Sequence, residues 1–308
     1  MRTVGVTGGA GFIGGHVIDH LVSRGYDVIS FDHMGRPVPG AETMLGDVRD
    51  ATAMTELAAH CDGIIHLAAV LGTQETIQNP RPSVESNISG GLNFLEAISQ
   101  YDLPGVYICV GNHWMNNAYS ISKTAVERLC RMYADYRGTQ VGTVRVVNAY
   151  GPRQVAAAPY GPGKVRKIMP AFICRALSGD PIEVYGDGEQ VSDMVHVHDV
   201  AAALVATLES CNAGAVPCRT IEVGPAEHHT VNEVAAGVAR VAARLMGGAE
   251  VPVNHLPMRP GETPGAQVTA DTTTLPLVGM SAHDLVPLAT GIIETVEWFA
   301  SVRGEHWT

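Results

Sequence analysis

Two side chains with complementary acid–base chemistry, Tyr119 and Lys123, lie four residues apart in the helix-forming stretch AYSISKTAVERLC. Residues at this spacing share one helix face, so the phenol and the ammonium are expected to project together. A phenol, with a pKa of about 10, is a poor base until a nearby cation favours its ionised form. Beside Lys123, Tyr119 is expected to take a proton from a substrate hydroxyl while a hydride leaves the same carbon. Alone, the pattern also fits an ordinary helix surface.

A hydride acceptor is indicated by the sequence TGGAGFIG at residues 7–14. Its spaced glycines are Gly8, Gly11 and Gly14. They permit a tight turn and close backbone approach to a pyrophosphate, while the following helix presents free N–H groups. Asp32 ends the second predicted strand about 20 residues on, where a carboxylate accepts both ribose hydroxyls of adenosine. This favours NAD as the cofactor, and the neighbouring His33 and Arg36 leave NADP as the alternative.

The scaffold for these residues is indicated by short β-branched runs that alternate with helix-length segments. The predicted strands are Thr3–Thr7, Asp27–Phe31, Thr43–Leu45, Gly63–Leu67, Val106–Val110 and Val141–Val147. The predicted helices are Phe12–Ser23, Ala51–Ala59, Ser83–Ser99 and Ala118–Tyr136. Such alternation is typical of a parallel sheet with helices on both faces. The fold class is therefore predicted as α/β, a doubly wound parallel sheet of the Rossmann type.

The composition of the chain changes after Asn148. Residues 151–163 are rich in glycine and proline, which predicts a loop. The elements predicted beyond it are helices Pro170–Leu177, Asp199–Leu208, Thr230–Leu245 and Leu288–Val302 and a strand Ile182–Tyr185. We therefore expect a smaller C-terminal substrate-binding lobe. The predicted division gives residues 1–148, with a returning segment near 190–222, to a dinucleotide-binding domain, and residues 149–189 and 223–308 to the lobe.

Composition excludes several classes of protein. Twenty basic and 31 acidic residues give a net charge of -11, which disfavours nucleic acid as a partner. The six cysteines are scattered without a CxxC pair, and no apolar run reaches the roughly 18 residues that a bilayer requires. With no basic and apolar leader at the start, we expect a soluble cytoplasmic protein with reduced thiols and no membrane partner.

Further motifs give the chain a family resemblance that covers nearly its whole length. They are GDV at residues 46–48, HLAA at 66–69, Asn87 in NISGGLNFLEA, RVVNAYGPRQ from Arg145, VYGDGEQ from Val184, Asp199, and RPGE from Arg259. With the glycine-rich segment and the Tyr/Lys pair, the chain resembles the extended short-chain dehydrogenase/reductase superfamily. Within it, the chain looks like the NAD-dependent nucleotide-sugar epimerase/dehydratase family, of the UDP-glucose 4-epimerase-like kind.

The resemblance implies specific site residues. Those implied for the dinucleotide are Gly8, Gly11, Phe12, Ile13, Gly14, Asp32, His33, Arg36, Asp47, Val48, Leu67, Ala68, Ala69, Tyr119 and Lys123. Those implied for the substrate are Asn148, Arg153, Met169, Tyr185 and Arg259. It also implies a homodimer in which the segments 83–99 and 118–136 pair with their symmetry mates, although their apolar faces also fit an ordinary core.

The sequence departs from the family pattern at two points. The segment CVGNHWMNNAY before Tyr119 lacks the Ser or Thr that hydrogen-bonds the reacting hydroxyl in the family. Asn112 or His113 can supply a donor instead, and Asn112 equally fits a turn former. In VSDMVHV, Ser192 stands where the family often has an arginine. Phosphate neutralisation is then expected from Arg259, from Arg153 or from the basic loop of Lys164, Arg166 and Lys167.

Two segments suggest sites that we do not predict. His196, His198 and Asp199 form an HVHD cluster, but tetrahedral zinc needs another ligand, and Asp199 fits the N-cap of the following helix. No metal is therefore expected. The GPGK segment at residues 161–164 lacks the outer glycine and the Ser/Thr of a P-loop, so nucleotide hydrolysis is rejected. This basic loop either folds over an anionic substrate or is a disordered surface loop.

The function that the resemblance favours is epimerisation at C4 of a nucleoside-diphosphate sugar, with a UDP-sugar substrate, NAD and a transient 4-keto intermediate. The resemblance also disfavours a 4,6-dehydratase, because such enzymes of the family usually place an acidic pair next to this segment and residues 111–117 contain no carboxylate. A 4-ketosugar reductase, a UDP-sugar decarboxylase and a catalytically silent protein that binds NAD or a sugar nucleotide stay open as alternatives.

Overall fold

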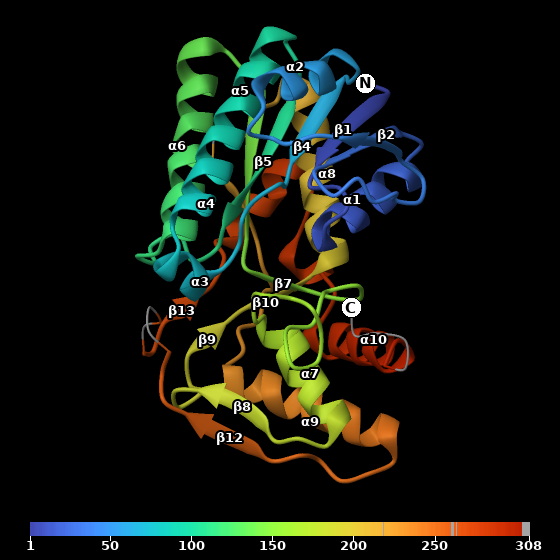
Figure 1. The fold of residues 1–308 in the computed structure, drawn as a ribbon, viewed down its shortest axis with the longest axis vertical. Coiled ribbons are helices and arrows are strands. Elements are labelled where there is room, and N and C mark those ends of the chain that lie inside the picture. The colour runs from blue at the N-terminus through green and yellow to red at the C-terminus, as the bar shows by residue number, and fades with distance from the viewer. Residues whose placement is uncertain (218, 260–261, 263, 304–308) are drawn as a thin grey trace.

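The computed structural model of the 308-residue chain describes all residues except 218, 260, 261, 263 and 304–308. Its upper half in Figure 1 is a seven-stranded sheet in which neighbouring strands run parallel. The strands are β1 (Thr3–Thr7), β2 (Asp27–Asp32), β3 (Glu42–Leu45), β4 (Gly63–His66), β5 (Gly105–Val110), β6 (Val141–Val146) and β11 (Ile221–Val223). Their order, β11-β6-β5-β4-β1-β2-β3, reverses between β1 and β4. Ligands of such sheets bind beyond the carboxyl ends of the strands at that point.

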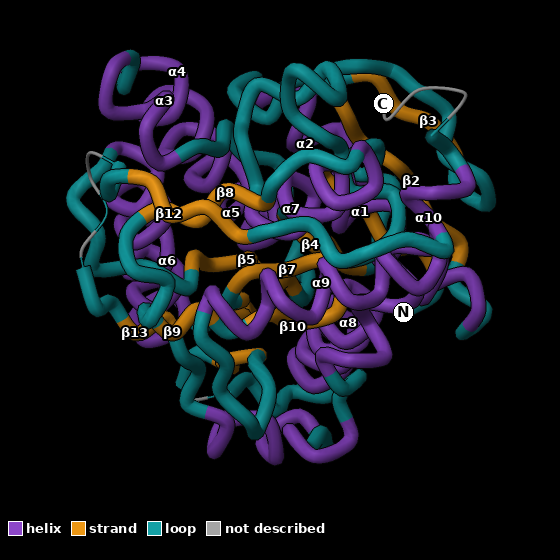
Figure 2. Tube along the Cα trace, turned by 90° about the horizontal axis from the view of Figure 1, so that it is seen from below, coloured by secondary structure: helices purple, strands orange, loops and turns teal. Residues whose placement is uncertain are grey.

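Helices cover both faces of this sheet, as the strand and helix alternation predicts. One face packs on α1 (Phe12–Ser23) and α8 (Val197–Asn212), and the other packs on α2 (Ala51–Ala59), α5 (Gly90–Gln100) and α6 (Ala118–Arg137). Along β5, Val106 and Ile108 join the first core, and Tyr107 and Cys109 join the second. This alternation follows from the two-residue period of a strand. Figure 2 shows the strands as a band between α8 on one side and α2 on the other.

The predicted helix over 83–99 is interrupted. It consists of α4 (Arg81–Val84), a π-helical turn at Glu85–Ser89, and α5. Within the wide turn, the buried Asn87 accepts from the Val70 N–H at 2.8 Å and donates to Ser122 Oγ at 2.9 Å. The turn therefore directs Asn87 towards both the segment after β4 and helix α6. The hydrophobic period of the sequence predicts a regular helix here and does not indicate this π-helical turn.

A second group of elements lies below the sheet in Figure 1. It contains α7 (Ile168–Ser178), α9 (Val231–Met246), α10 (Leu288–Ser301) and the pair β8 (Ile182–Tyr185) with β12 (Val253–Leu256), around a core of their own. Two short pairs stand near the junction: β7 (Asn148–Tyr150) with β10 (Met194–His196), and β9 (Val191–Ser192) with β13 (Gln267–Val268). The chain returns to the main sheet through α8 and β11. The division into two domains at the predicted boundaries stays a prediction.

The start of α8 corrects one expectation. Asp199 is not its N-cap, because the helix begins at Val197 after His196. The Asp199 carboxylate instead accepts the N–H of Val286 at 2.9 Å, which joins α8 to the segment before α10. Asp199 thus accepts a hydrogen bond from a backbone N–H 87 residues further along the chain, and not from an N–H in the first turn of its own helix. Among the described residues, no helix has both the length and the apolar character to span a bilayer.

Candidate active site

A cavity of about 450 Å³ lies beyond the carboxyl ends of β5 and β6 and opens between the sheet and the second group of elements. Its size is typical of small-molecule sites. The predicted residues that line it are Phe12, Ile13, Asn112, Tyr119, Asn148, Arg166, Lys167, Met169, Tyr185, Ser192 and Arg259. The cavity therefore brings together the glycine-rich segment, the Tyr/Lys helix and segments more than a hundred residues further along the chain.

Tyr119 and Lys123 enter this region from the first turns of α6. The helix begins after Asn117, whose side chain accepts the N–H of Ser120 at 2.9 Å. Tyr119 keeps part of its surface open to the cavity, whereas Lys123 is buried with its Nζ 4.0 Å from the centre of the Tyr107 ring. Lys123 Nζ has no hydrogen-bond partner among the described residues. The cation is held in an apolar layer behind the cavity wall.

Burial moves the pKa values of the two groups in opposite directions. It raises the pKa of Tyr119 to about 12 and lowers the pKa of Lys123 to about 8, since burial disfavours both charged forms. We expected Lys123 to lower the pKa of Tyr119, but the net shift in this structure is a rise. The physical reason is that desolvation of the phenol dominates, while the ammonium lies against the Tyr107 ring.

Asn112 and His113, the two candidates to replace the missing Ser or Thr, lie differently relative to the cavity. Asn112 lines the cavity, and its Oδ1 accepts from Ser120 Oγ at 3.4 Å. It also forms a turn, because its carbonyl accepts the N–H of Met115. His113 is exposed and lies outside the cavity lining. The structure therefore brings only Asn112 to the cavity that Tyr119 faces.

The glycine-rich segment forms a cradle that side chains would fill. Gly8 has a φ of 70°, and a Cβ there would lie 2.9 Å from the backbone nitrogen of Ala68. A Cβ on Gly14 would lie 2.2 Å from the Gly8 carbonyl oxygen. Helix α1 begins at Phe12 after Gly11, and no side chain caps it. Its first N–H groups are thus available to an anion, so the segment fits a pyrophosphate.

The residues predicted around the adenosine half lie at the carboxyl edge of the sheet. Asp32 ends β2, is 8% exposed, and accepts the N–H of Met34 at 2.9 Å. His33 lies 3.4 Å from the Asp32 carboxylate, whereas the Arg36 guanidinium is directed to the Met34 sulfur. Because Arg36 is directed to Met34 rather than to Asp32, the carboxylate suits a free ribose better than a phosphorylated one.

Two further backbone segments complete this edge. Thr7 Oγ1 accepts the N–H groups of Leu67 and Ala68 at 3.2 and 3.3 Å, and Ala69 follows them. Asp47 pairs with the Arg49 guanidinium, which holds the pKa of that carboxyl below its usual value. Val48 is buried beside Gly90. These contacts order the loops after β1, β3 and β4.

One part of the cavity wall contains two guanidinium groups, each paired with a glutamate of the same wall. Arg259 lies over the Tyr185 ring, 4.6 Å from its centre, and pairs with Glu262. Arg166 donates to the Tyr185 hydroxyl at 3.0 Å and to Glu183 at 2.9 Å. Aromatic contact and ion pairing thus hold two guanidinium groups beside one tyrosine.

Another part of the wall contains the residues around the Ser192 position. Asn148 donates to Ser192 Oγ at 2.8 Å, and both side chains line the cavity. Lys167 also lines it; burial lowers the pKa of this ammonium, and the Glu75 carboxylate opposes that shift. Lys167 and Arg166 are therefore the cations of the 164–167 loop that face the cavity.

Two predicted cations lie elsewhere. Arg153 is outside the cavity lining; it pairs with Asp19 at 2.6 Å and donates to His16 at 3.2 Å, both on α1. The structure therefore does not support Arg153 as a substrate ligand, because its guanidinium is bound to that helix. Lys164 is exposed and also lies outside the lining.

Sequence reasoning missed the short helix α3 (Thr73–Gln78). Thr73, Gln74 and Glu75 line the cavity, and Thr76 Oγ1 accepts the Tyr119 N–H at 3.2 Å. The available signal was position, because the segment follows β4, and loops at the carboxyl ends of parallel strands carry the ligand contacts. Its polar six-residue sequence has no clear helical period.

Residues 4–224 match the model of the NAD dependent epimerase/dehydratase family. The chain is 28% identical over 329 residues to the UDP-N-acetyl-alpha-D-glucosaminuronate decarboxylase of Bacillus cytotoxicus, and the match covers 97% of this chain and 98% of that protein.

Two solved structures are similar over almost the whole chain. The UDP-glucose 4-epimerase of Thermotoga maritima with UDP-glucose has a TM-score of 0.83 and 26% identity, covering 98% of this chain and 99% of that one. The UDP-glucose 4-epimerase of Thermus thermophilus in complex with NAD has a TM-score of 0.81 and 29% identity, covering 97% of this chain and 99% of that one.

Proposed function

This chain belongs to the NAD-dependent epimerase/dehydratase family, whose enzymes modify nucleotide sugars, and we propose that it epimerises a nucleoside-diphosphate sugar at C4. The favoured substrate is a UDP-sugar, and the reaction passes through a transient 4-keto intermediate. The observation that carries this proposal is the phenol of Tyr119 on the wall of the 450 Å³ cavity, one helical turn from Lys123 and beside the loop that begins α1.

NAD is the cofactor. Bound NAD would supply reversible hydride acceptance at the sugar carbon and a positive charge that favours the tyrosine phenolate. The steric cradle at Gly8 and Gly14 and the uncapped start of α1 fit its pyrophosphate. In this proposal the remaining dinucleotide contacts come from Gly11, Phe12, Ile13, Asp32, His33, Arg36, Asp47, Val48, Leu67, Ala68, Ala69, Tyr119 and Lys123.

The protein's own side chains handle the proton. Tyr119 takes it from the sugar 4-hydroxyl and gives it back after the ring has turned in the cavity. With its pKa lowered to about 8, Lys123 is still mostly charged at neutral pH and stabilises the phenolate from behind. Asn112 supplies the amide donor to the reacting oxygen that Ser or Thr supplies elsewhere in the family.

The substrate contacts follow from the walls of the cavity. Arg259, Arg166 and Lys167 face the diphosphate in this proposal, and Tyr185 lies with the nucleotide base. Asn148 donates to the diphosphate region, and Met169 contributes an apolar wall. Guanidinium groups suit phosphate oxygens because their donors form a planar fork.

A product assay tests the reaction. The protein with NAD is incubated separately with UDP-glucose, UDP-N-acetylglucosamine and UDP-glucuronate, and the sugars are resolved by chromatography. We expect the C4 epimer of at least one substrate, with no net change in NADH. Tyr119→Phe should abolish turnover and leave NAD bound, whereas the exposed Tyr101→Phe should match the wild type. Activity retained in Tyr119→Phe would remove the phenol from the mechanism.

A second candidate is decarboxylation of a UDP-sugar acid. It is supported by the Bacillus cytotoxicus relative and by Lys167, a cation at the cavity wall that suits a sugar carboxylate. Release of carbon dioxide from UDP-glucuronate in the same assay identifies this reaction. Net NADH consumption with a ketosugar identifies a reductase, and bound NAD with no product from any sugar identifies a silent binding protein.

We also propose a homodimer formed through α5 and α6. On α6, Ile121, Met132 and Tyr136 are exposed and lie on one side of the helix, since spacings of 11 and 15 residues are close to whole numbers of turns. Leu92 is exposed on the adjacent α5. Apolar side chains at such positions are typical of an interface.

A further inference from the structure

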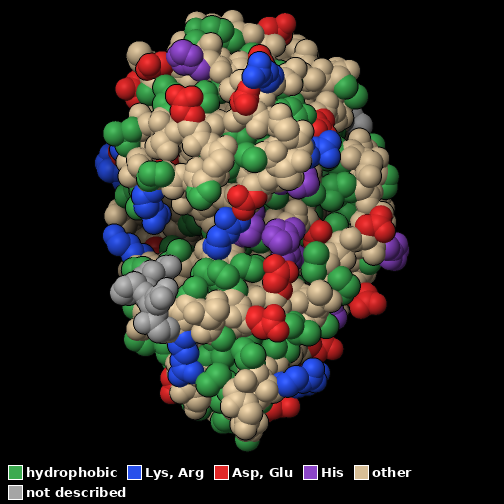
Figure 3. Space-filling model, turned by 90° about the vertical axis from the view of Figure 1, so that its right-hand side faces the viewer, with side chains coloured by type: hydrophobic (Ala, Val, Ile, Leu, Met, Phe, Trp, Pro, Cys, Tyr) green, Lys and Arg blue, Asp and Glu red, His purple; other side chains and the backbone are tan. Residues whose placement is uncertain are grey.

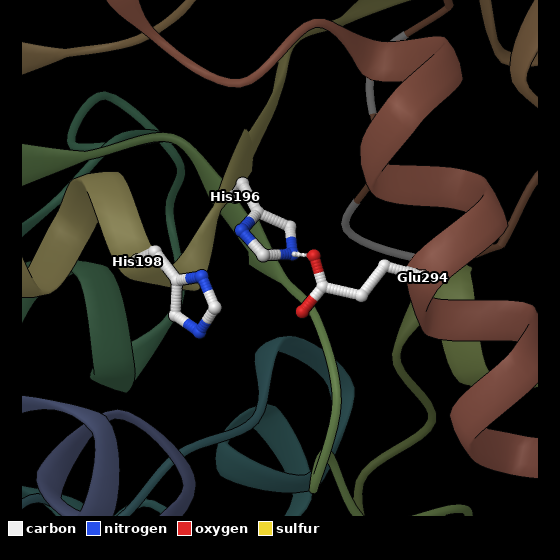
Figure 4. A group of neighbouring side chains, drawn as sticks. All are labelled: His196, His198 and Glu294. Atoms are coloured by element: carbon white, nitrogen blue, oxygen red, sulfur yellow. Dashed lines mark ion pairs between the residues drawn. The ribbon is translucent and has the colours of Figure 1, made fainter. Parts of the chain in front are cut away.

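Three side chains that can bind a metal ion meet outside the candidate active site. They are His196 at the end of β10, His198 in the first turn of α8, and Glu294 on α10, and none lines the 450 Å³ cavity. One ligand atom of each lies within 4.8 Å of the others, and His196 Nε2 is 3.6 Å from Glu294 Oε2. Figure 4 shows the two rings side by side, with the carboxylate directed at His196 from the facing helix.

The state of His196 is a separate observation that points to a ligand. This side chain is fully buried, and neither ring nitrogen has a hydrogen-bond partner among the described residues. A buried polar group without a partner costs free energy, so such groups in proteins are nearly always paired. The Glu294 carboxylate, 3.6 Å away, is too distant for a normal hydrogen bond but is directed at the same nitrogen.

We propose that His196, His198 and Glu294 bind a divalent transition-metal ion of the zinc class. Zinc binds histidine nitrogen and carboxylate oxygen at about 2.0–2.2 Å in tetrahedral geometry, which places ligand atoms about 3.4 Å apart. The His196–Glu294 pair is already close to that separation. His198 is exposed, so its side chain can turn to bring one ring nitrogen equally close to the other two ligand atoms, and water takes the fourth position.

The chemistry of the donors selects the ion. Two imidazoles and one carboxylate suit zinc, cobalt and nickel, whereas magnesium and calcium require oxygen ligands. The His16 ring, on α1, packs edge-on against His198 at 5.2 Å.

The position of the site indicates a structural role. It joins the C-terminal helix α10 to β10 and α8, and β10 pairs with β7, whose Asn148 lines the cavity. Figure 3 shows histidine side chains gathered near mid-height on one side of the molecule, where solvent reaches them. An ion here would therefore cross-link the second group of elements to the main sheet without touching the reacting sugar.

Metal titration of the NAD-bound full chain tests the proposal. Chelator-treated protein is titrated with Zn²⁺ by calorimetry, and its melting temperature is measured with and without Zn²⁺. We expect one equivalent to bind at micromolar affinity or better and to raise the melting temperature. His198→Ala and Glu294→Gln should each weaken binding at least tenfold. The matched controls His60→Ala and Glu297→Gln, both exposed and outside the cluster, should bind as the wild type does.

The outcomes separate cleanly. No binding by the wild type at 100 µM Zn²⁺, or unchanged binding in both cluster variants, would overturn the proposal. Because His198 and Glu294 are at least partly exposed, their variants are expected to melt like the metal-free wild type. Co²⁺ provides a second measurement on the wild type alone: a tetrahedral visible spectrum without a thiolate charge-transfer band supports the site. A thiolate band would instead assign the ion to cysteine and overturn it.

Discussion

At the scale of single residues, burial separates the pKa values of the acid–base pair. Packing raises the pKa of Tyr119 to about 12 and lowers that of Lys123 to about 8, whereas free in water the two groups titrate at nearly the same pH. At neutral pH the phenol of the NAD-free protein is thus protonated, and Lys123 loses its proton only about one pH unit higher. Extra positive charge beside them is what would convert the phenol into a base.

The lowered pKa of Lys123 predicts a pH-dependent stability. The unfolded lysine keeps its proton up to a pKa of about 10.5, but the folded one loses it near 8. Between these values the unfolded state binds more protons, so this group makes the free energy of unfolding rise with pH, by at most about 1.4 kcal/mol per unit. Below pH 8 the destabilising effect of the buried cation is fully present.

Urea unfolding of NAD-free protein at pH 7 to 10 measures this effect. Wild type minus Lys123→Met should give a difference in unfolding free energy that is flat near pH 7 and rises between pH 8 and 10. Taking the difference removes the opposing contribution of buried thiols such as Cys130, whose pKa is raised. The exposed Lys164→Met should give a difference with no slope; parallel behaviour of the two variants would contradict the burial argument.

Asn112 is predicted to hydrogen-bond the reacting oxygen. Asn112→Ala should lower kcat/KM about 10- to 100-fold, since one hydrogen bond to a developing charge is worth roughly 1.5–3 kcal/mol. Asn112→Ser should retain more activity because it keeps a donor. His113→Ala, outside the cavity, serves as the control and should resemble the wild type. Equal activity in the Asn112 and His113 alanine variants would exclude this role.

At the scale of elements, helix α1 shows how close packing selects residues at a functional loop. Its uncapped start lies in the loop that follows β1, and Gly14 packs against the backbone of the loop itself. A Cβ on the adjacent Gly15 would meet nothing closer than the Arg153 guanidinium at 3.6 Å. Two neighbouring glycines in one helix therefore have different physical requirements.

This difference predicts opposite outcomes for two alanine substitutions. Gly14→Ala should lower the melting temperature and abolish NAD binding, because its Cβ would lie 2.2 Å from the Gly8 carbonyl. Gly15→Ala should be neutral or stabilising by up to about 1 kcal/mol, the helix propensity difference between glycine and alanine. Calorimetric titration with NAD and thermal melts check both. Normal NAD affinity in Gly14→Ala would refute the steric argument.

At the scale of the whole molecule, the chain builds separate cores on the two faces of the sheet and a third among α7, α9 and α10. The cavity lies where the sheet meets this third core, so its walls come from segments spread between residues 12 and 268. Apolar side chains are exposed on α5 and α6, at the surface where we propose the dimer interface.

Light scattering tests the proposed dimer. The wild type should have twice the chain mass of 32.5 kDa. Met132→Glu combined with Ile121→Glu should give a monomer, because charges would be desolvated in the interface. Leu45→Glu, at an exposed residue of the edge strand β3, should remain dimeric. A wild type of single-chain mass would refute the proposal.

Local patterns in the chain were enough to predict the α/β fold, the glycine-rich loop, Asp32 and the Tyr119/Lys123 pair. The bounds predicted for α1 and α2 are those observed. These features are local: strand and helix periods, glycine spacing and a four-residue separation on a helix are each set by near neighbours in the chain.

Features that depend on segments far apart in the chain could not be predicted in this way. Desolvation raised the pKa of Tyr119, which was expected to be lowered. Arg153 forms an ion pair with Asp19 on α1 and does not line the cavity. Asp199 accepts a hydrogen bond from the Val286 N–H and does not cap α8. The third potential metal ligand, Glu294, comes from the last helix rather than from the residue beside His198. Burial, ion pairs and ligand sets depend on which surfaces pack together, and sequence spacing does not encode that across a hundred residues.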